Sequence, residues 1–321
     1  MSTNPLPERI PLEGIRAARE RIADAAIRTP LIRLPGSETP EIWLKLETLQ
    51  PVGSFKIRGA RNALAELDST ALAQGVYTAS AGNMALGLAW CAKQRGIPFT
   101  AIVPEQAPSA KLTKLEELGA RLIRVPFPAW WRVLQEHRYE GVHGCFIHPV
   151  ANAAVMAGNG SIGLEILEEL PGVETVLVPF GGGGLSCGIA SALKGVRSSA
   201  SVVACEIETA TPLRTSFQAG GPRTVERTPS FVDGIGGAGI LPEMWPLIQG
   251  LIDSDAVVSL VEAAAAIRTL VERVHVVAEG AGAVPVAAAL SGRVPGTVMC
   301  CVVSGGNLDA AVLIDILAGR R

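Results

Sequence analysis

Short apolar runs alternate with longer segments of helical periodicity along the whole sequence, and this alternation limits the fold more than any other feature. The runs expected to form strands are Ile42–Leu46, Phe99–Val103, Arg121–Val125, Thr175–Phe180, Val202–Ile207, Ala256–Leu260, His275–Ala278 and Thr297–Val303. Helical periodicity marks residues 11–26, Met84–Arg95, Ser109–Leu118, Val155–Leu170, Val261–Val274 and Leu308–Ala318. Unbroken apolar strands between helices predict an α/β protein, with parallel sheets covered by helices on both faces.

The chain of 321 residues is long enough for one large or two medium domains. A separate series of strands and helices runs from about Val76 to Cys145. We therefore expect a small domain at residues 73–147 and a large domain built from residues 1–72 and 148–321.

Composition excludes several classes of function. Hydrophobic residues make up 48% and charged residues 18% of the chain, the net charge is −2, and no block of lysine or arginine occurs. Nucleic acid and membrane are therefore not expected partners. No apolar run is long enough to span a bilayer and no secretory signal is recognisable, which predicts a cytoplasmic protein.

Cysteine and histidine patterns do not indicate a metal site. The six cysteines form no Cys-x-x-Cys pair and lie mostly in apolar runs, while the four histidines lack the spacing of metal ligands. We expect reduced, buried thiols and no bound metal.

The stretch Gly53–Ala60 carries the first residue that could do chemistry. Lys56 lies in Gly-Ser-Phe-Lys-Ile-Arg-Gly-Ala, next to Phe55 and two residues before Arg58. An enclosed lysine beside another cation has a lowered pKa and attacks carbonyl groups. Phe55 would supply the apolar wall and Arg58 the neighbouring cation. An isolated lysine of this kind is more often a solvated helix start, so the interpretation depends on other motifs.

The tetraglycine run Gly181–Gly184, followed by Leu185 and Ser186, comes directly after a predicted strand and opens a helical pattern. Successive backbone N–H groups at a helix N-terminus bind an anion, with the helix dipole assisting. No Gly-Lys-Ser/Thr follows, and Ser186 stands where a dinucleotide motif needs its third glycine. The run therefore predicts a site for one phosphate, and a tight packing turn is the alternative.

Three further small-residue turns follow predicted strands, namely Ser80-Ala81-Gly82-Asn83, Glu279–Ala283 and Ser304-Gly305-Gly306-Asn307. Each by itself is explained by an ordinary helix cap. Because the carboxyl ends of parallel strands share one edge of a sheet, the turns and the tetraglycine run are expected to converge on one ligand-binding crevice.

Together with a stretch from Ala154 to Glu165, these motifs in this order resemble the fold-type II pyridoxal-phosphate enzymes, which are tryptophan synthase β-like. The closest resemblance is to the serine/threonine dehydratase and serine racemase group, and it covers nearly the whole chain. It implies a two-domain enzyme with pyridoxal 5'-phosphate in the large domain, a small-molecule amino-acid substrate and a homodimer.

The resemblance also assigns roles to individual residues. Lys56 would hold the cofactor as a Schiff base, Asn83 would hydrogen-bond its phenolic oxygen, and Ser304 would face its pyridine nitrogen. The remaining implied cofactor contacts are Phe55, Gly181, Gly182, Gly183, Gly184, Leu185, Glu279 and Gly305. The implied substrate contacts are Ser80, Ala81, Gly82 and Asn83.

The implied activity is α,β-elimination, the dehydration and deamination of a β-hydroxy amino acid such as L-threonine or L-serine. Its products would be a 2-oxo acid and ammonia, which places the protein in amino-acid metabolism. A serine hydroxyl at Ser304 keeps the pyridine nitrogen less protonated than a carboxylate would, and this favours loss of a β-substituent. Racemases of the group have a serine where this chain has Ala81, and alanine cannot transfer a proton.

Alternative functions remain open. One is a racemase for serine or another amino acid on the same fold. Another is a β-replacement enzyme such as a cysteine synthase, although those have Asp-Arg after the lysine and a Gly-Thr-Gly-Gly-Thr loop, unlike Ile57-Arg58 and the tetraglycine here. The last is a protein that binds a small ligand without catalysis.

Several positions depart from the dehydratase pattern. Met84 stands in place of the usual histidine, and Val150-Ala151-Asn152 replaces the usual aromatic and acidic residues after His148-Pro149. Both changes predict a less polar wall and a larger or less polar substrate. Glu206 matches a metal ligand of metal-activated members, but Pro212 stands six residues later where an acidic residue is needed, so no divalent cation is expected.

Overall fold

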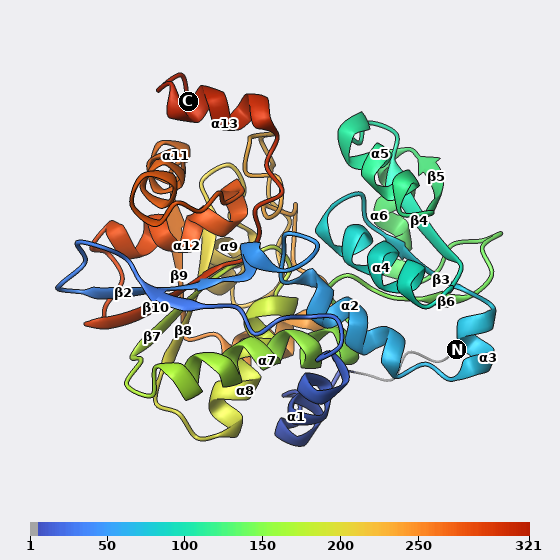
Figure 1. The fold of residues 1–321 in the computed structure, drawn as a ribbon, viewed down its shortest axis with the longest axis horizontal. Helices are drawn as coiled ribbons and strands as arrows, with labels where there is room; N and C mark the ends of the chain where they lie inside the picture. The colour runs from blue at the N-terminus through green and yellow to red at the C-terminus, as the bar shows by residue number, and fades with distance from the viewer. Residues whose placement is uncertain (1–5) are drawn as a thin grey trace.

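The computed structural model describes residues 6–321 and contains two sheets in separate lobes (Figure 1). Residues 1–5 of the predicted large domain lie outside the described residues. The six-stranded sheet has the strand order β1-β2-β10-β7-β8-β9. Its strands are β1 (Leu31–Arg33), β2 (Glu41–Leu46), β7 (Thr175–Pro179), β8 (Ser201–Ile207), β9 (Ser254–Val258) and β10 (Val298–Val303). Every neighbouring pair is parallel except β1 with β2.

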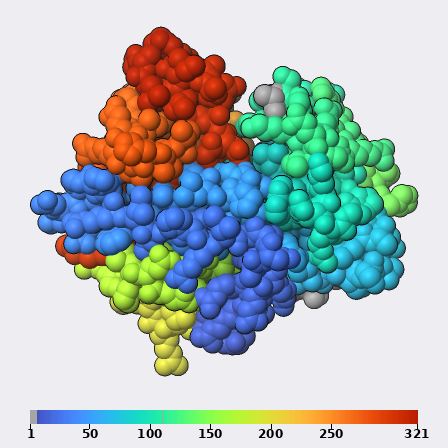
Figure 2. All heavy atoms as spheres, viewed as in Figure 1, coloured from blue at the N-terminus to red at the C-terminus, as the bar shows by residue number. Residues whose placement is uncertain are grey.

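The smaller lobe holds a four-stranded parallel sheet of order β5-β4-β3-β6. Its strands are β3 (Val76–Ala79), β4 (Phe99–Pro104), β5 (Arg121–Val125) and β6 (Cys145–Phe146). All of them fall inside the predicted small domain, whose boundaries at residues 73 and 147 stay a prediction. On the face shown in Figure 2, a notch separates this lobe, in teal, from the C-terminal part of the chain, in red.

Helices cover both sheets. Those grouped with the smaller sheet are α3 (Ser69–Ala73), α4 (Asn83–Gln94), α5 (Ser109–Glu117) and α6 (Phe127–Glu136). The others are α1 (Leu12–Arg21), α2 (Lys56–Ala65), α7 (Ala153–Glu169), α8 (Gly184–Gly195), α9 (Pro212–Ala219), α10 (Trp245–Leu251), α11 (Leu260–Thr269), α12 (Gly280–Leu290) and α13 (Ala310–Leu317). Short 3₁₀ turns lie at Glu47–Leu49 and Pro242–Met244, and a π-helical turn at Leu270–Val274 extends α11.

Alternating side chains of the large sheet build two separate cores. Val176 and Val178 of β7 pack into the cluster that contains residues of α1, α7 and α8. Leu177, between them, packs into the cluster formed with α11 and α12. Because successive side chains of a strand point to opposite faces, an all-apolar strand must be covered on both. The predicted α/β class with helices on both faces is therefore confirmed.

One predicted strand is wrong. Residues 275–278 form no strand, because His275 adopts a left-handed conformation (φ 59°) at the end of the π-helical turn. The run is apolar for a different reason, since Ala278 is buried in the core cluster under α12. The turn at Glu279 therefore follows an extended segment rather than a strand.

Another predicted strand is shifted toward the N-terminus. The strand expected at Ala256–Leu260 is β9, Ser254–Val258, because Ser259 already caps α11. Ser259 and Glu262 form a reciprocal capping box, in which each side chain accepts a bond from the other residue's backbone. The Ser-x-x-Glu spacing was visible in the sequence and marks this boundary.

Two expectations from composition can be compared with the structure. The six cysteines are free thiols, and all but the half-buried Cys145 are buried. Each helix in the described part of the chain is too short or too polar to cross a lipid bilayer.

Candidate active site

The segment that carries Lys56 is held against the turn that follows β10. Lys56 is the first residue of α2. Just before it, the N–H of Phe55 donates to the carbonyl of Ser304 (3.0 Å), and Gly306 donates to the carbonyl of Gly53 (2.9 Å). Two predicted motifs that are about 250 residues apart in sequence are thus hydrogen-bonded to each other.

Asn83 links the remaining turns across the two lobes. It opens α4 of the smaller lobe, and its Nδ2 donates to the carboxylate of Glu279 (2.8 Å) in the larger lobe. Its Oδ1 accepts a bond from Nδ2 of Asn307 (2.9 Å). The turns at Ser80, Glu279 and Ser304 therefore meet at this one amide.

The tetraglycine run joins the same crevice through Pro149 and Val150. Nζ of Lys56 donates to the carbonyl of Pro149 (3.1 Å). A Cβ on Gly182 would lie 3.0 Å from the Val150 side chain, and one on Gly184 would lie 3.0 Å from the Val150 carbonyl. Gly183 has a φ of 97°, a left-handed conformation that glycine adopts without strain. All four turns predicted to converge do so.

Several residues of these turns are partly exposed to solvent. Lys56, the residues Ser80 to Asn83, Pro149 and the first two glycines of the run are half-buried, whereas the strands β3 and β7, which precede two of these turns, are completely buried. Ser304, Gly305 and Glu279 form the buried floor beside them. The half-buried members of the predicted site thus offer a surface that a ligand can reach.

Lys56 has a perturbed amine. Burial lowers its pKa to about 8, and the nearby Glu279 opposes this shift. The ring of Phe55 lies with its centroid 5.0 Å from Nζ, which confirms the predicted apolar wall. No acidic side chain forms an ion pair with this amine within the described residues. A fraction of the amine is therefore neutral and able to react near neutral pH.

The predicted part of Arg58 in this perturbation is wrong. Its guanidinium points away from the crevice and pairs with Glu47 (2.8 Å) and Glu165 (2.6 Å), both fully or almost fully buried. Because these carboxylates neutralise its charge, Arg58 does not act on Lys56. It is the centre of a buried ionic cluster that also contains Lys45 and Thr29.

Glu279 is the second perturbed group of the crevice. Burial, assisted by Asp233, raises its pKa to about 7, while the hydrogen bond from Asn83 opposes the shift. A Cβ on Gly305 would lie 2.6 Å from its Oε1, so this carboxyl contacts the floor of the site. At neutral pH both its protonated and its ionised forms are therefore populated.

Sequence reasoning missed some members of this arrangement. The carbonyl of Pro149 is a backbone group and has no residue signature, although His148-Pro149 marked the region. Asn307 was recognised only as part of a motif, and its bond to Asn83 was not expected. The buried ionic cluster around Arg58 could have been suspected from charged residues inside apolar strands and helices, such as Lys45 in Ile42–Leu46.

The three departures from the dehydratase pattern have structural consequences. Met84 is 2% exposed and packs into the core of the smaller lobe, while Val150 packs on the tetraglycine loop. The carboxylate of Glu206 accepts bonds from the N–H groups of Leu213 (2.7 Å) and Arg214 (3.0 Å) and so caps α9. The expectation that no metal binds there stays a prediction.

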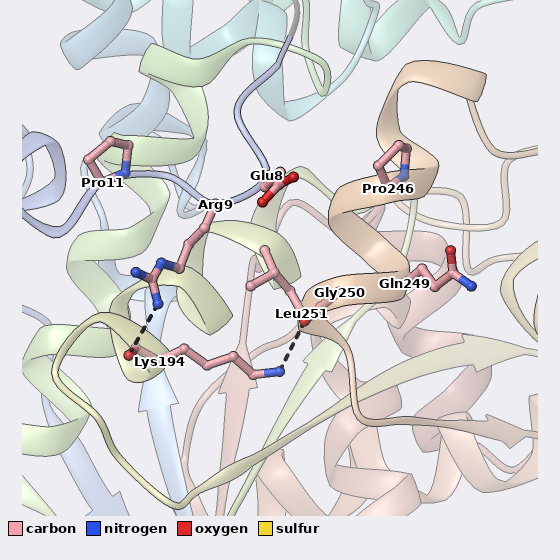
Figure 3. Close-up of a pocket in the computed structure, with 8 residues that line it drawn as sticks. All are labelled: Glu8, Arg9, Pro11, Lys194, Pro246, Gln249, Gly250 and Leu251. Atoms are coloured by element: carbon pink, nitrogen blue, oxygen red, sulfur yellow. Dashed lines mark hydrogen bonds between the residues drawn. The ribbon is translucent and has the colours of Figure 1, made fainter.

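A large surface cavity lies elsewhere. It measures about 900 Å³ and is lined by residues such as Arg9, Lys194 and Gln249 (Figure 3). Lys194 is in the last turn of α8, whose first residue is Gly184, so Lys194 lies about 15 Å along the helix from the tetraglycine loop at a rise of about 1.5 Å per residue. The cavity contains none of the motif residues and is not part of this site.

The groups present fit a phosphorylated aldehyde cofactor. The amine of Lys56 can bond an aldehyde carbon, and the second N–H of the Asn83 amide is free for an oxygen of the ligand. Among residues 6–321, no N–H from Gly181 to Leu185 donates to a turn or loop carbonyl, which leaves these donors for a phosphate. The Ser304 hydroxyl is neutral and suits a weakly basic ring nitrogen.

The lowered pKa of Lys56 predicts a specific pH dependence. In the apoprotein, the rate at which borohydride traps pyridoxal phosphate on Lys56 should rise about tenfold per pH unit below its pKa and level off above it, because only the neutral amine attacks. With the pKa at about 8, the plateau should begin there. Peptide mass spectrometry measures the labelling, and a rate still rising tenfold per unit well above that pH would contradict the burial argument.

Comparison with known proteins agrees with this geometry. Residues 22–305 match the family described as "Pyridoxal-phosphate dependent enzyme". The L-threonine ammonia-lyase of Thermotoga maritima is 39% identical over 96% of this chain and 78% of its own, and that of Geobacter sulfurreducens is 38% identical over 97% and 80%. The structure of maize serine racemase superposes with a TM-score of 0.88 at 31% identity, covering 97% of both chains.

The match covers most of the chain and includes Lys56, three turns of the crevice and the start of the fourth at Ser304 and Gly305. This protein therefore belongs to the family of pyridoxal-phosphate dependent enzymes.

Proposed function

We propose that this protein is an ammonia-lyase that converts a β-hydroxy amino acid, L-threonine or L-serine, into a 2-oxo acid and ammonia. The observation that carries the proposal is the free amine of Lys56 beside an anion-binding loop and a neutral Ser304 hydroxyl. The relatives named L-threonine ammonia-lyase support threonine as the first substrate to test.

The residues of the crevice have the following proposed tasks. N–H groups of the tetraglycine run and Leu185 hold the phosphate, and Asn83 holds the phenolic oxygen. Phe55 and Gly305 would contact the ring, Ser304 would hydrogen-bond its nitrogen, and Glu279 orients Asn83 by accepting its hydrogen bond. N–H groups from Ser80 to Asn83 bind the substrate carboxylate at the start of α4, where the helix dipole favours an anion.

Pyridoxal phosphate, when bound, supplies an electron sink that makes the α-proton of an amino acid acidic. Lys56 takes this α-proton, and its pKa of about 8 leaves a usable fraction of neutral base at neutral pH. The carbonyl of Pro149 orients the amine by accepting its hydrogen bond. The β-hydroxyl then takes a proton from the Lys56 ammonium and leaves as water, and addition of one water to the unsaturated product releases ammonia and the 2-oxo acid.

A panel of β-hydroxy amino acids tests the proposal. Purified holoenzyme should release ammonia and 2-oxo acid in equal amounts from L-threonine or L-serine. Larger or less polar substrates belong in the panel because Val150 makes the wall beside the loop apolar. Cysteine formed from serine and sulfide would instead support β-replacement, and a protein that stays colourless with the cofactor would support a ligand-binding role.

Racemisation should be weak, because Ala81 has no proton to transfer to the face opposite Lys56. We expect the wild-type enzyme to convert L-serine into pyruvate much faster than into D-serine. The substitution Ala81→Ser should raise the rate of D-serine formation by about tenfold or more. Chiral chromatography with a pyruvate assay measures both products. Equal rates of D-serine and pyruvate formation in the wild-type enzyme would show that the dehydratase assignment is wrong.

The homodimer implied by the resemblance also remains a proposal. Sedimentation analysis of the holoenzyme should give about twice the mass of the 33.4 kDa chain.

A further inference from the structure

We propose that Asn159 is a positioning residue. It orients the N–H of Leu185, a proposed phosphate donor directly after the tetraglycine run. The proposal rests on the proposed binding of the cofactor phosphate by this loop. Asn159 lies in α7, is 1% exposed, and its Nδ2 donates to the carbonyl of Gly184 (3.3 Å). Gly184 is both the last glycine of the run and the first residue of α8.

Asn159 is enclosed where three helices meet. A Cβ on Gly59 of α2 would lie 2.9 Å from its Oδ1, and a Cβ on Gly188 of α8 would lie 3.3 Å from its Cβ. Gly59 is three residues after Lys56, so one side chain contacts both the helix that carries the amine and the helix that carries the loop. The carboxamide therefore has little freedom to turn away from Gly184.

The hydrogen bonding of Asn159 is incomplete. Its Oδ1 is buried and has no partner within the described residues. A buried polar atom without a partner destabilises the fold, and an apolar side chain of similar volume would avoid that cost. Packing alone thus gives no reason for an amide here, whereas the bond to Gly184 does.

The effect on the loop follows from the planarity of the peptide bond. The carbonyl of Gly184 and the N–H of Leu185 belong to one rigid plane and point in opposite directions. A donor that holds the carbonyl of Gly184 toward α7 therefore directs the N–H of Leu185 away from α7. Leu185 is one of the proposed phosphate contacts. Asn159 therefore fixes the orientation of a phosphate-binding N–H without contacting the cofactor itself.

The test compares two ligands that differ only in the phosphate ester. Apoprotein carrying Asn159→Ala or Asn159→Leu is titrated with pyridoxal phosphate and with pyridoxal, and binding is followed by absorbance. Loss of a well-oriented hydrogen bond from Leu185 to the phosphate should weaken pyridoxal phosphate binding by about five- to tenfold. Binding of pyridoxal, which reacts with Lys56 but has no phosphate, should change less than about twofold. If the alanine variant folds poorly, Asn159→Leu takes its place, because leucine nearly keeps the side-chain volume of asparagine.

Asn62→Ala is the matched control. Asn62 is a buried asparagine of α2 whose Nδ2 donates to the carbonyl of Ala154 (2.8 Å) at the α2–α7 contact. Removing it deletes a similar bond away from the loop, so both dissociation constants should stay near the wild-type values.

Two results would overturn the inference. Equal weakening of both ligands would make Asn159 purely structural, and no change in either would show that the bond to Gly184 does not aim the loop. If wild-type protein bound pyridoxal and pyridoxal phosphate equally tightly, the loop would not bind the phosphate. That result would contradict the proposed function and not only the role of Asn159.

Discussion

Replacing Lys56 by alanine is expected to lower ammonia release from L-threonine by at least about a thousandfold, because one side chain serves as both the attachment point and the proton acceptor. No other lysine can substitute for it within the described residues of the crevice, since Lys45 is buried in the ionic cluster and Lys111 pairs with Asp233. Steady-state assays with saturating pyridoxal phosphate measure the loss of activity. The absorbance of the cofactor attached to Lys56 should also be missing from the variant.

Two controls make this result specific. Lys56→Arg keeps the positive charge but has a guanidinium that stays protonated, so it should be as inactive as the alanine variant. Lys114→Ala removes an exposed lysine of α5 and should retain full activity. Full turnover by Lys56→Ala, or cofactor attached at another residue, would contradict the whole interpretation of the site.

Replacing Arg58 by alanine is expected to lower the free energy of unfolding by about 3–5 kcal/mol, the usual cost of removing one partner from a buried ion pair. Arg58 donates to both carboxylate oxygens of Glu47 and of Glu165, and neither glutamate is more than 5% exposed at its side chain. Without it, Lys45 still pairs with Glu165, but among residues 6–321 Glu47 keeps only the neutral donors of Thr29 and Gln50. Urea denaturation of the apoprotein measures the change.

The same substitution should reverse the pH dependence of stability. Burial alone would raise the pKa of Glu47, but Arg58, assisted by Thr29 and Lys45, outweighs burial and holds this pKa below the ordinary value of 4.5. In wild-type protein this carboxylate therefore stabilises the fold above pH 4.5, and the contribution is lost as pH falls through its native pKa. In Arg58→Ala, burial dominates, the pKa rises, and stability should increase on mild acidification.

Arg16→Ala is the control for this second prediction. Arg16 pairs with Glu13 on the surface, with side chains 52% and 79% exposed, and its removal should cost less than about 1 kcal/mol. A loss of similar size in both variants would mean that the buried cluster contributes no more than a surface pair.

Local patterns in the sequence were sufficient for the fold class and for most strands. An all-apolar run such as Thr175–Phe180 predicts a strand buried on both faces, and β7 is one. The run His275–Ala278 shows the limit of this reasoning. Periodicity records that a segment is buried, but it does not record whether a neighbouring strand is available for pairing.

The sequence by itself determined which turns meet at one crevice, because small residues after apolar runs predict ligand-binding helix starts, and Lys56 lies among these turns. Only the tertiary structure decided how the groups are paired. It turned Arg58 away from Lys56 toward buried carboxylates, brought Asn83 to Glu279 and Asn307, and placed Asn159 against Gly184. Such pairings join residues far apart in the chain, and local periodicity carries no information about which distant segments will face each other.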